Sequence, residues 1–281
     1  MTETSVIWLR VAAALYSIGL VDSVFLLTRQ KEAFFRIALG AFWLGGLFHL
    51  VSIVELGLIQ NQFPVTDIFQ RLSLCAFLIT VSFSFAYWKY RTASLSVFIF
   101  PLVFILSLIA ALGDNDAGWT SEALKNSWLI AHIVFILLGY TAVLFTAIAA
   151  VLYLVQERRL KAKLKSTNDS GWIPLDWLPP LDTLERIAHA MLLFGFPCMT
   201  VGLILGAVLV QETTLGAAYF ADPKVIASYA MWGLYVLLLF LRQSAGLRGR
   251  KAAYLSGAVL AVMLCVWAAN LVSHVHRFGA P

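Results

Sequence analysis

Charged residues are scarce in this 281-residue chain. Asp, Glu, Lys and Arg together make up 12% of it, while 61% of the residues are hydrophobic and the mean hydropathy is +0.86. A soluble domain usually carries about a quarter charged residues. Because no soluble packing could hide so much apolar surface, the composition excludes a soluble protein and predicts an integral membrane protein.

Cysteine motifs and hydrolase motifs are absent as well. The three cysteines, Cys75, Cys198 and Cys265, each lie alone in an apolar run, and no two form a CxxC pair. This pattern excludes a disulfide framework, a dithiol exchange site, an iron–sulfur site and a CxxCH haem attachment site. We expect three small buried residues. The chain also lacks an HExxH zinc motif and an internal repeat.

Long apolar runs fill most of the chain, and each is long enough to cross a bilayer as a helix. None shows the strict alternation of a barrel strand. The sequence therefore predicts an all-α, polytopic membrane protein that forms a single membrane domain over 1–281. Its eight predicted transmembrane helices lie near 6–27, 35–59, 69–88, 94–112, 128–155, 187–210, 225–241 and 252–273.

Basic residues are distributed unevenly between alternate connections. If the N-terminus lies outside, fifteen of the 20 Lys and Arg residues fall on the inner side and five on the outer side. This positive-inside bias predicts that the N- and C-termini both lie outside the membrane. It also explains the net charge of +5 without nucleic acid. The segment before the first apolar run is acidic rather than basic, and no clear small-residue cleavage site follows, so we expect a retained span and not a cleaved signal peptide.

The longest connection, 156–186, is predicted to be a cytoplasmic loop. It contains a basic helix end, a flexible STNDSG turn and a Trp/Pro-rich interfacial segment. Docking of a soluble partner on this loop is the alternative interpretation, although no motif supports it.

Ionisable residues within the apolar runs need a physical reason, because charge at membrane depth is costly. Asp22, Glu55 and His189 lie near the ends of their runs, where we expect them to reach water. His49 lies near mid-span and requires either a hydrogen-bond partner or a metal.

Three further histidines share one predicted depth at the outer face. His132 begins the fifth run, and His274 and His276 end the eighth. Two imidazoles from separate helices could clamp a haem iron from opposite sides; the alternative is interfacial histidines that never meet. His274 and His276 are two residues apart and point to different faces of one helix, so only one of them is expected to be a ligand. Nearby, Asp222-Pro223 predicts a helix start.

Five segments between 120 and 279 together resemble a known family. They read NSWLIAHIVFILLGY, LDTLERIAHAMLLFGFPCMTVGLILGAVLVQE, LGAAYFADPKV, LRGRKAAYLSG and NLVSHVHRFG, and FPVTDIFQRLSL at 63–74 extends the pattern. In this order and spacing they are similar to the cytochrome c assembly membrane family, which includes CcsA, ResC, CcmC and the HemX-like branch. The resemblance makes 120–279 the haem-handling core.

The resemblance implies a non-covalent haem at the outer face, with His132 and His276 as axial ligands and His274 as a competitor for the second position. We further expect Tyr219, Phe220 and Asp222 to form part of the loop over the haem, Trp128 and Trp232 to flank it, and His49 to be a deeper ligand or a proton-side partner.

Several positions depart from the family pattern. Leu215, Tyr219 and Ala221 stand where the family has tryptophans, and Gln62 and Phe240 stand where CcsA-like members have membrane histidines. Fewer indoles leave less aromatic surface to hold a porphyrin edge. These departures place the chain nearest the HemX-like branch.

The leading hypothesis is a haem-binding inner (plasma) membrane protein of cytochrome c assembly. Its expected partners are haem, a second assembly membrane protein and apocytochrome c. The sequence contains no recognisable set of catalytic residues, so the protein is expected to be at most one component of a haem-ligation system. The alternative is a HemX-like regulator of tetrapyrrole synthesis that acts on a soluble enzyme through the 156–186 loop. A haem transporter ranks third, because few polar residues line the inner half.

Overall fold

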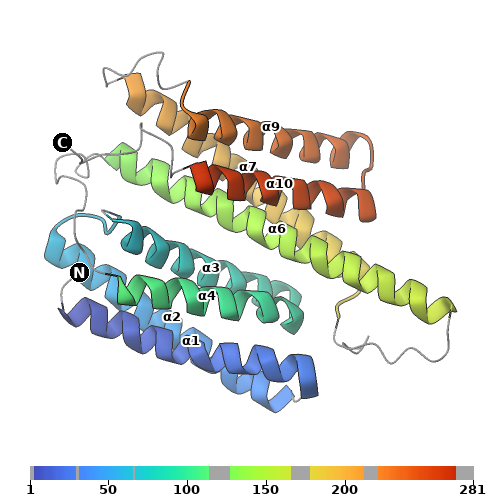
Figure 1. The fold of residues 1–281 in the computed structure, drawn as a ribbon, viewed down its shortest axis with the longest axis horizontal. Helices are drawn as coiled ribbons and strands as arrows, with labels where there is room; N and C mark the ends of the chain where they lie inside the picture. Colours follow the sequence, from blue (N-terminus) through green and yellow to red (C-terminus); the bar gives the residue numbers. More distant parts are fainter. Residues whose placement is uncertain are drawn as a thin grey trace. The chain divides into compact units, whose positions relative to one another are not determined.

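A computed structural model describes residues 3–29, 32–65, 67–113, 127–165, 178–211 and 221–269. These residues form eight α-helices, and each is long and apolar enough to cross a membrane, which confirms the all-α, eight-span prediction. The helices divide into two compact units (Figure 1). Unit 1 contains α1 (Glu3–Arg29), α2 (Glu32–Gln60), α3 (Ile68–Tyr90), the short 3-10 helix η1 (Ala93–Leu95) and α4 (Ser96–Leu112). Unit 2 contains α6 (Ser127–Lys165), α7 (Leu181–Gln211), α9 (Pro223–Ser244) and α10 (Arg250–Ala268).

Large apolar side chains cover the exposed surface of these helices. Leu58 is 76% exposed, and Trp88 and Ile37 are 67% and 62% exposed. Helices that are apolar on all sides suit a lipid environment. For the same reason, the prediction of three buried cysteines is wrong for Cys265, which lies exposed on α10, whereas Cys198 is buried. Lipid accepts a thiol as readily as a protein core does, so hydrophobicity alone did not predict burial.

Aromatic rings fill the core of unit 1. Phe42 of α2 stacks on Phe100 of α4 with ring centroids 4.4 Å apart, and Phe83 of α3 meets Phe100 edge-on at 5.2 Å. Gly19 of α1 allows this packing, since a Cβ there would lie 2.8 Å from the Phe100 ring. The four helices are therefore held by ring contacts from different helices.

Small residues let α6 and α7 approach closely in unit 2. A Cβ added at Gly195 of α7 would lie 2.5 Å from the Ala142 Cβ of α6. At Gly202 it would lie 3.1 Å from the Ile136 backbone nitrogen, and at Gly139 it would lie 3.1 Å from the Met199 sulfur. Such packing is typical of membrane helices, which gain van der Waals contact where glycine removes bulk.

Local signals set two helix starts. Asp222 accepts a hydrogen bond from the Lys224 backbone N–H at 2.9 Å, and Pro223 occupies the first position of α9, as the sequence predicts. Asp67 caps α3 in the same way through the Gln70 N–H at 2.7 Å. Within the expected 156–186 loop, α6 continues to Lys165 and α7 begins at Leu181.

Candidate functional site

His132 lies in the second turn of α6 and contacts α7. Its Nδ1 lies 2.6 Å from the carbonyl oxygen of Gly202. Because a carbonyl only accepts, Nδ1 carries the proton and donates this bond. The ring is thereby oriented, and Nε2 keeps the lone pair that a metal needs. This is the arrangement expected of a metal-ligating histidine.

The two tryptophans that were predicted to flank the haem lie on the same helix as His132 and on α9. Trp128 stands one helical turn before His132 on α6 and is 62% exposed. Trp232 of α9 donates from Nε1 to the Thr200 hydroxyl at 3.0 Å and stacks on Phe196 with centroids 6.4 Å apart. Thr200 and Gly202 lie two residues apart on α7, so His132 and Trp232 bond to the same turn of that helix.

Asp222 lies at the start of α9, near the same end of unit 2. Its side chain is 5% exposed and caps the helix. Lys224 is close enough to His132 for the two to interact electrostatically. The structure thus places His132, Asp222, Trp128 and Trp232 in the half of unit 2 where α6 and α9 begin, which we call the His132 end. Tyr219, Phe220, His274 and His276 lie outside the described residues, so their roles remain predictions.

His49 is fully buried in unit 1 and has polar partners from two other helices. Its Nδ1 lies 3.3 Å from the Tyr16 hydroxyl of α1, and its Nε2 lies 2.8 Å from the Ser73 hydroxyl of α3. The Thr80 hydroxyl lies 3.3 Å from Tyr16 and extends the chain. The sequence left two alternatives for this imidazole, a hydrogen-bond partner or a metal. The structure shows hydrogen-bond partners, and a metal could bind only if one of them were displaced.

Asp22 corrects an expectation. We expected it to reach water, but its side chain is only 1% exposed, and neither carboxylate oxygen has a hydrogen-bond partner among the described residues. The face of α1 that carries Gly19 packs against α4, and the following turn, which carries Asp22, is buried in the same contact. The Ser23 hydroxyl in that turn lies 3.4 Å from the Ser96 carbonyl oxygen. Tertiary packing therefore overrode position along the span.

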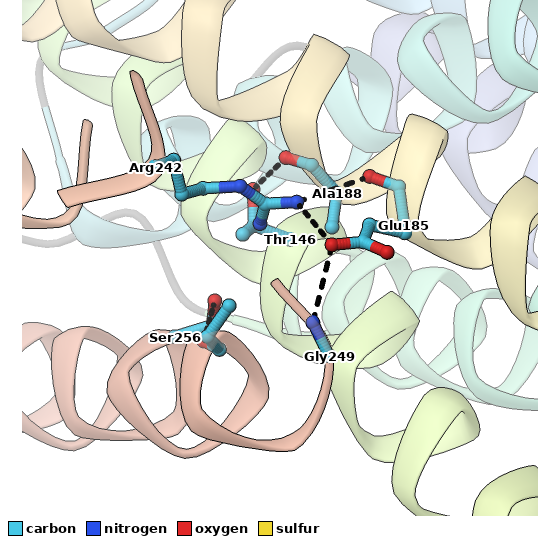
Figure 2. A network of polar contacts seen from close by, with 7 residues as sticks. Thr146, Glu185, Ala188, Arg242, Gly249 and Ser256 are labelled. Atoms are coloured by element: carbon cyan, nitrogen blue, oxygen red, sulfur yellow. Dashed lines mark hydrogen bonds and ion pairs between the residues drawn. The ribbon is translucent and has the colours of Figure 1, made fainter. Parts of the chain in front are cut away.

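Sequence reasoning missed a partly buried ion pair at the opposite end of unit 2 (Figure 2). Arg242 of α9, whose side chain is 6% exposed, lies 3.5 Å from the Glu185 carboxylate of α7. The Gly249 N–H donates to the same carboxylate at 3.2 Å, which ties the start of α10 to α7. A cavity of about 20 Å³ lies beside the pair, also lined by Tyr153 and Ser256; this is room for one water.

The ion pair joins residues 57 positions apart, and only the general need to pair buried charge hinted at it. Through these contacts the Glu185 carboxylate of α7 holds α9 and the start of α10 together. Within the described part of the chain, no group of three or more His, Cys, Asp or Glu side chains could hold a metal ion. A haem site needs only axial ligands, and His132 is the described residue suited to supply one.

Comparison with known proteins identifies relatives along most of the chain. Residues 47–276 match the family model described as "Cytochrome C assembly protein". The cytochrome c biogenesis protein CcsA of Prochlorococcus marinus (strain MIT 9301) is 27% identical over 240 residues, covering 79% of this chain and 77% of that protein. CcsA of strain MIT 9215 is 26% identical over 269 residues (89% and 86%), and that of Guillardia theta is 27% identical over 240 residues (78% and 78%).

Proposed function

Because the chain belongs to the cytochrome c assembly protein family, we propose that it binds haem non-covalently through His132. It is a CcsA-like multi-pass membrane protein of cytochrome c biogenesis. The observation that carries the proposal is the His132–Gly202 hydrogen bond of 2.6 Å. A ring held this way presents one nitrogen in a defined direction at no further ordering cost when a ligand binds.

The proposed site lies at the His132 end of unit 2, and the distribution of basic residues along the sequence favours the outer face of the membrane for this end. His276, with His274 as the competing residue, would hold the iron together with His132. Tyr219, Phe220 and Asp222 would belong to the loop over the haem, and Trp128 would offer an exposed indole beside it. When bound, haem supplies the iron and the vinyl groups for attachment to apocytochrome thiols.

The residues of this chain hold and orient the group. The Gly202 carbonyl keeps the proton on Nδ1 of His132, so Nε2 stays unprotonated. Trp232, tied to Thr200, fixes α9 against α7, and Asp222 fixes the start of α9. The expected partners, a second assembly membrane protein and apocytochrome c, follow from the family.

His49 is proposed as a proton-side partner in unit 1 and not as a resting ligand. Both of its ring nitrogens lie within hydrogen-bonding distance of hydroxyl groups, so ligation would cost one of these contacts. The chain Thr80–Tyr16–His49–Ser73 consists of groups that each donate and accept.

The test is the visible spectrum, oxidised and reduced, of the detergent-purified chain from haem-sufficient cells. We expect a sharp reduced α-band at near-stoichiometric haem, lost in His132→Ala and His276→Ala. The matched control is His189→Ala, a histidine at the other end of unit 2, which should keep the band. No haem in the wild-type chain after reconstitution, or equal loss in His189→Ala, would contradict the proposal.

A HemX-like regulatory function is the second candidate. One observation favours it: α6 continues from the apolar run as a basic helix to Lys165. Such an extension could present charge to a soluble enzyme of tetrapyrrole synthesis. Replacing Arg159, Lys163 and Lys165 of this extension with Gln separates the two functions, because regulation should fail while the haem spectrum survives.

A further inference from the structure

Cationic side chains dominate the end of unit 2 opposite His132, which we call the basic end. Here α6 and α9 end while α7 and α10 begin. Three acidic residues, Glu157, Asp182 and Glu185, form ion pairs with Lys161, Arg186 and Arg242. Beyond these pairs the basic end carries a cationic excess: Arg158, Arg159, Arg248, Arg250 and Lys251.

Two arginines of this excess interact with the neutral Tyr254 hydroxyl, Arg250 by direct hydrogen bonds and Arg158 electrostatically. Arg250 donates to the Tyr254 hydroxyl from Nε at 3.1 Å and from Nη2 at 3.0 Å, and its guanidinium carbon lies 5.4 Å from the ring centroid. Arg158, from α6, interacts with the same hydroxyl. All three side chains are exposed. Glu157 is a carboxylate that acts electrostatically on Arg250, and it is already paired with Lys161 at 2.5 Å.

Two like charges at one hydroxyl repel each other, and an anion between them would remove that repulsion. Guanidinium groups match phosphate oxygens with paired donors, and a tyrosine hydroxyl can add a third donor. The chemistry that fits this point is therefore a phosphate with at least two free oxygens.

The surface next to Tyr254 indicates where the phosphate comes from. Toward the middle of α10, the exposed face continues through Gly257, Ala258, Ala261 and Leu264. A Cβ at Gly257 would meet nothing within 4 Å, so this track is open. A charged head at the first turn of a span, with a smooth apolar track along the next three turns, matches one phospholipid molecule.

We propose that Arg158, Arg250 and Tyr254 form a binding site for the phosphate of an anionic phospholipid, whose acyl chain lies along the α10 track. Basic pockets at helix ends bind anionic headgroups in this way. The site is independent of haem, because it lies at the other end of unit 2 from His132. It anchors α6 to α10 through the lipid.

Native mass spectrometry of the full chain, titrated with phosphatidylglycerol in detergent, tests the site. The double variant Arg158→Gln/Arg250→Gln should weaken binding on the order of tenfold or more. The matched control, Arg159→Gln/Arg186→Gln, removes the same charge from the same end and should change binding by less than about twofold. Equal losses in the two double variants would overturn the proposal, since binding would then depend on net charge alone.

Tyr254→Phe provides a variant that keeps the ring and the fold. It removes the hydroxyl that holds the two arginines, so we expect weaker phosphatidylglycerol binding with unchanged helical circular dichroism; unchanged binding would count against the site. Phosphatidylcholine and inorganic phosphate complete the experiment. Neither should displace phosphatidylglycerol at equal concentration, and displacement by inorganic phosphate would show a free-anion site and refute the lipid assignment.

Discussion

Gly195 offers the sharpest test of the α6–α7 packing. In Gly195→Ala the new Cβ would lie 2.1 Å from the Tyr235 hydroxyl oxygen and 2.5 Å from the Ala142 Cβ. Ordinary contacts begin near 3.4 Å, so Ala142 must retreat by about 1 Å, and Ala142 has no rotamer to change. Tyr235 is fully buried and packs on Phe196 at 6.4 Å, so its ring is not free to move away.

The expected magnitude follows from these two clashes. Overpacking costs about 1–3 kcal/mol at each clash, and replacing a helical glycine by alanine returns about 1 kcal/mol. The net loss is about 1–5 kcal/mol, or a Tm lower by about 2–20 °C at the sensitivity of domains of this size. Thermal unfolding of the full chain in one detergent, followed by helical circular dichroism, measures it.

Two companion variants make this test specific. Gly233→Ala on α9 meets nothing within 4 Å, so it should be neutral or stabilising by up to about 1 kcal/mol. Tyr235→Phe removes a buried hydroxyl that has no partner in the described structure, and it should rescue part of the Gly195→Ala loss. If Gly195→Ala were as stable as the wild type, the close approach of α6 and α7 would be wrong.

Three further stability predictions use the same assay. Asp222→Ala should cost about 1 kcal/mol through the lost α9 cap, while Asp222→Asn should keep most of it; equal effects would argue against capping. His49→Leu should cost about 1–3 kcal/mol because it leaves the Tyr16 and Ser73 hydroxyls without their partner, and an unchanged Tm would refute that network. Asp22→Asn should stabilise by about 1 kcal/mol or more, since a carboxylate with no hydrogen-bond partner among the described residues costs more to bury than an amide; a lower Tm would show that the carboxylate has a partner.

Local features of the sequence were sufficient to predict the transmembrane helices and the start of one of them. Each apolar run became a helix, because length and hydrophobicity alone decide what spans a bilayer. Asp222-Pro223 set the start of α9, since a cap needs only its own next few residues. The ordered motifs between 120 and 279 identified the family, which the match over 47–276 confirmed. The HemX-like placement and the haem ligands remain proposals.

Only the tertiary structure decided which residues meet. The His132–Gly202 bond spans 70 residues and the Arg242–Glu185 contact spans 57, and no spacing rule predicts either. The sequence did not predict which side chains are buried. Asp22 is buried although it lies near the end of a span, and Cys265 is exposed although it lies in an apolar run. The physical reason is that lipid and protein core are both apolar, so a membrane helix carries little record of which face it turns to its neighbours.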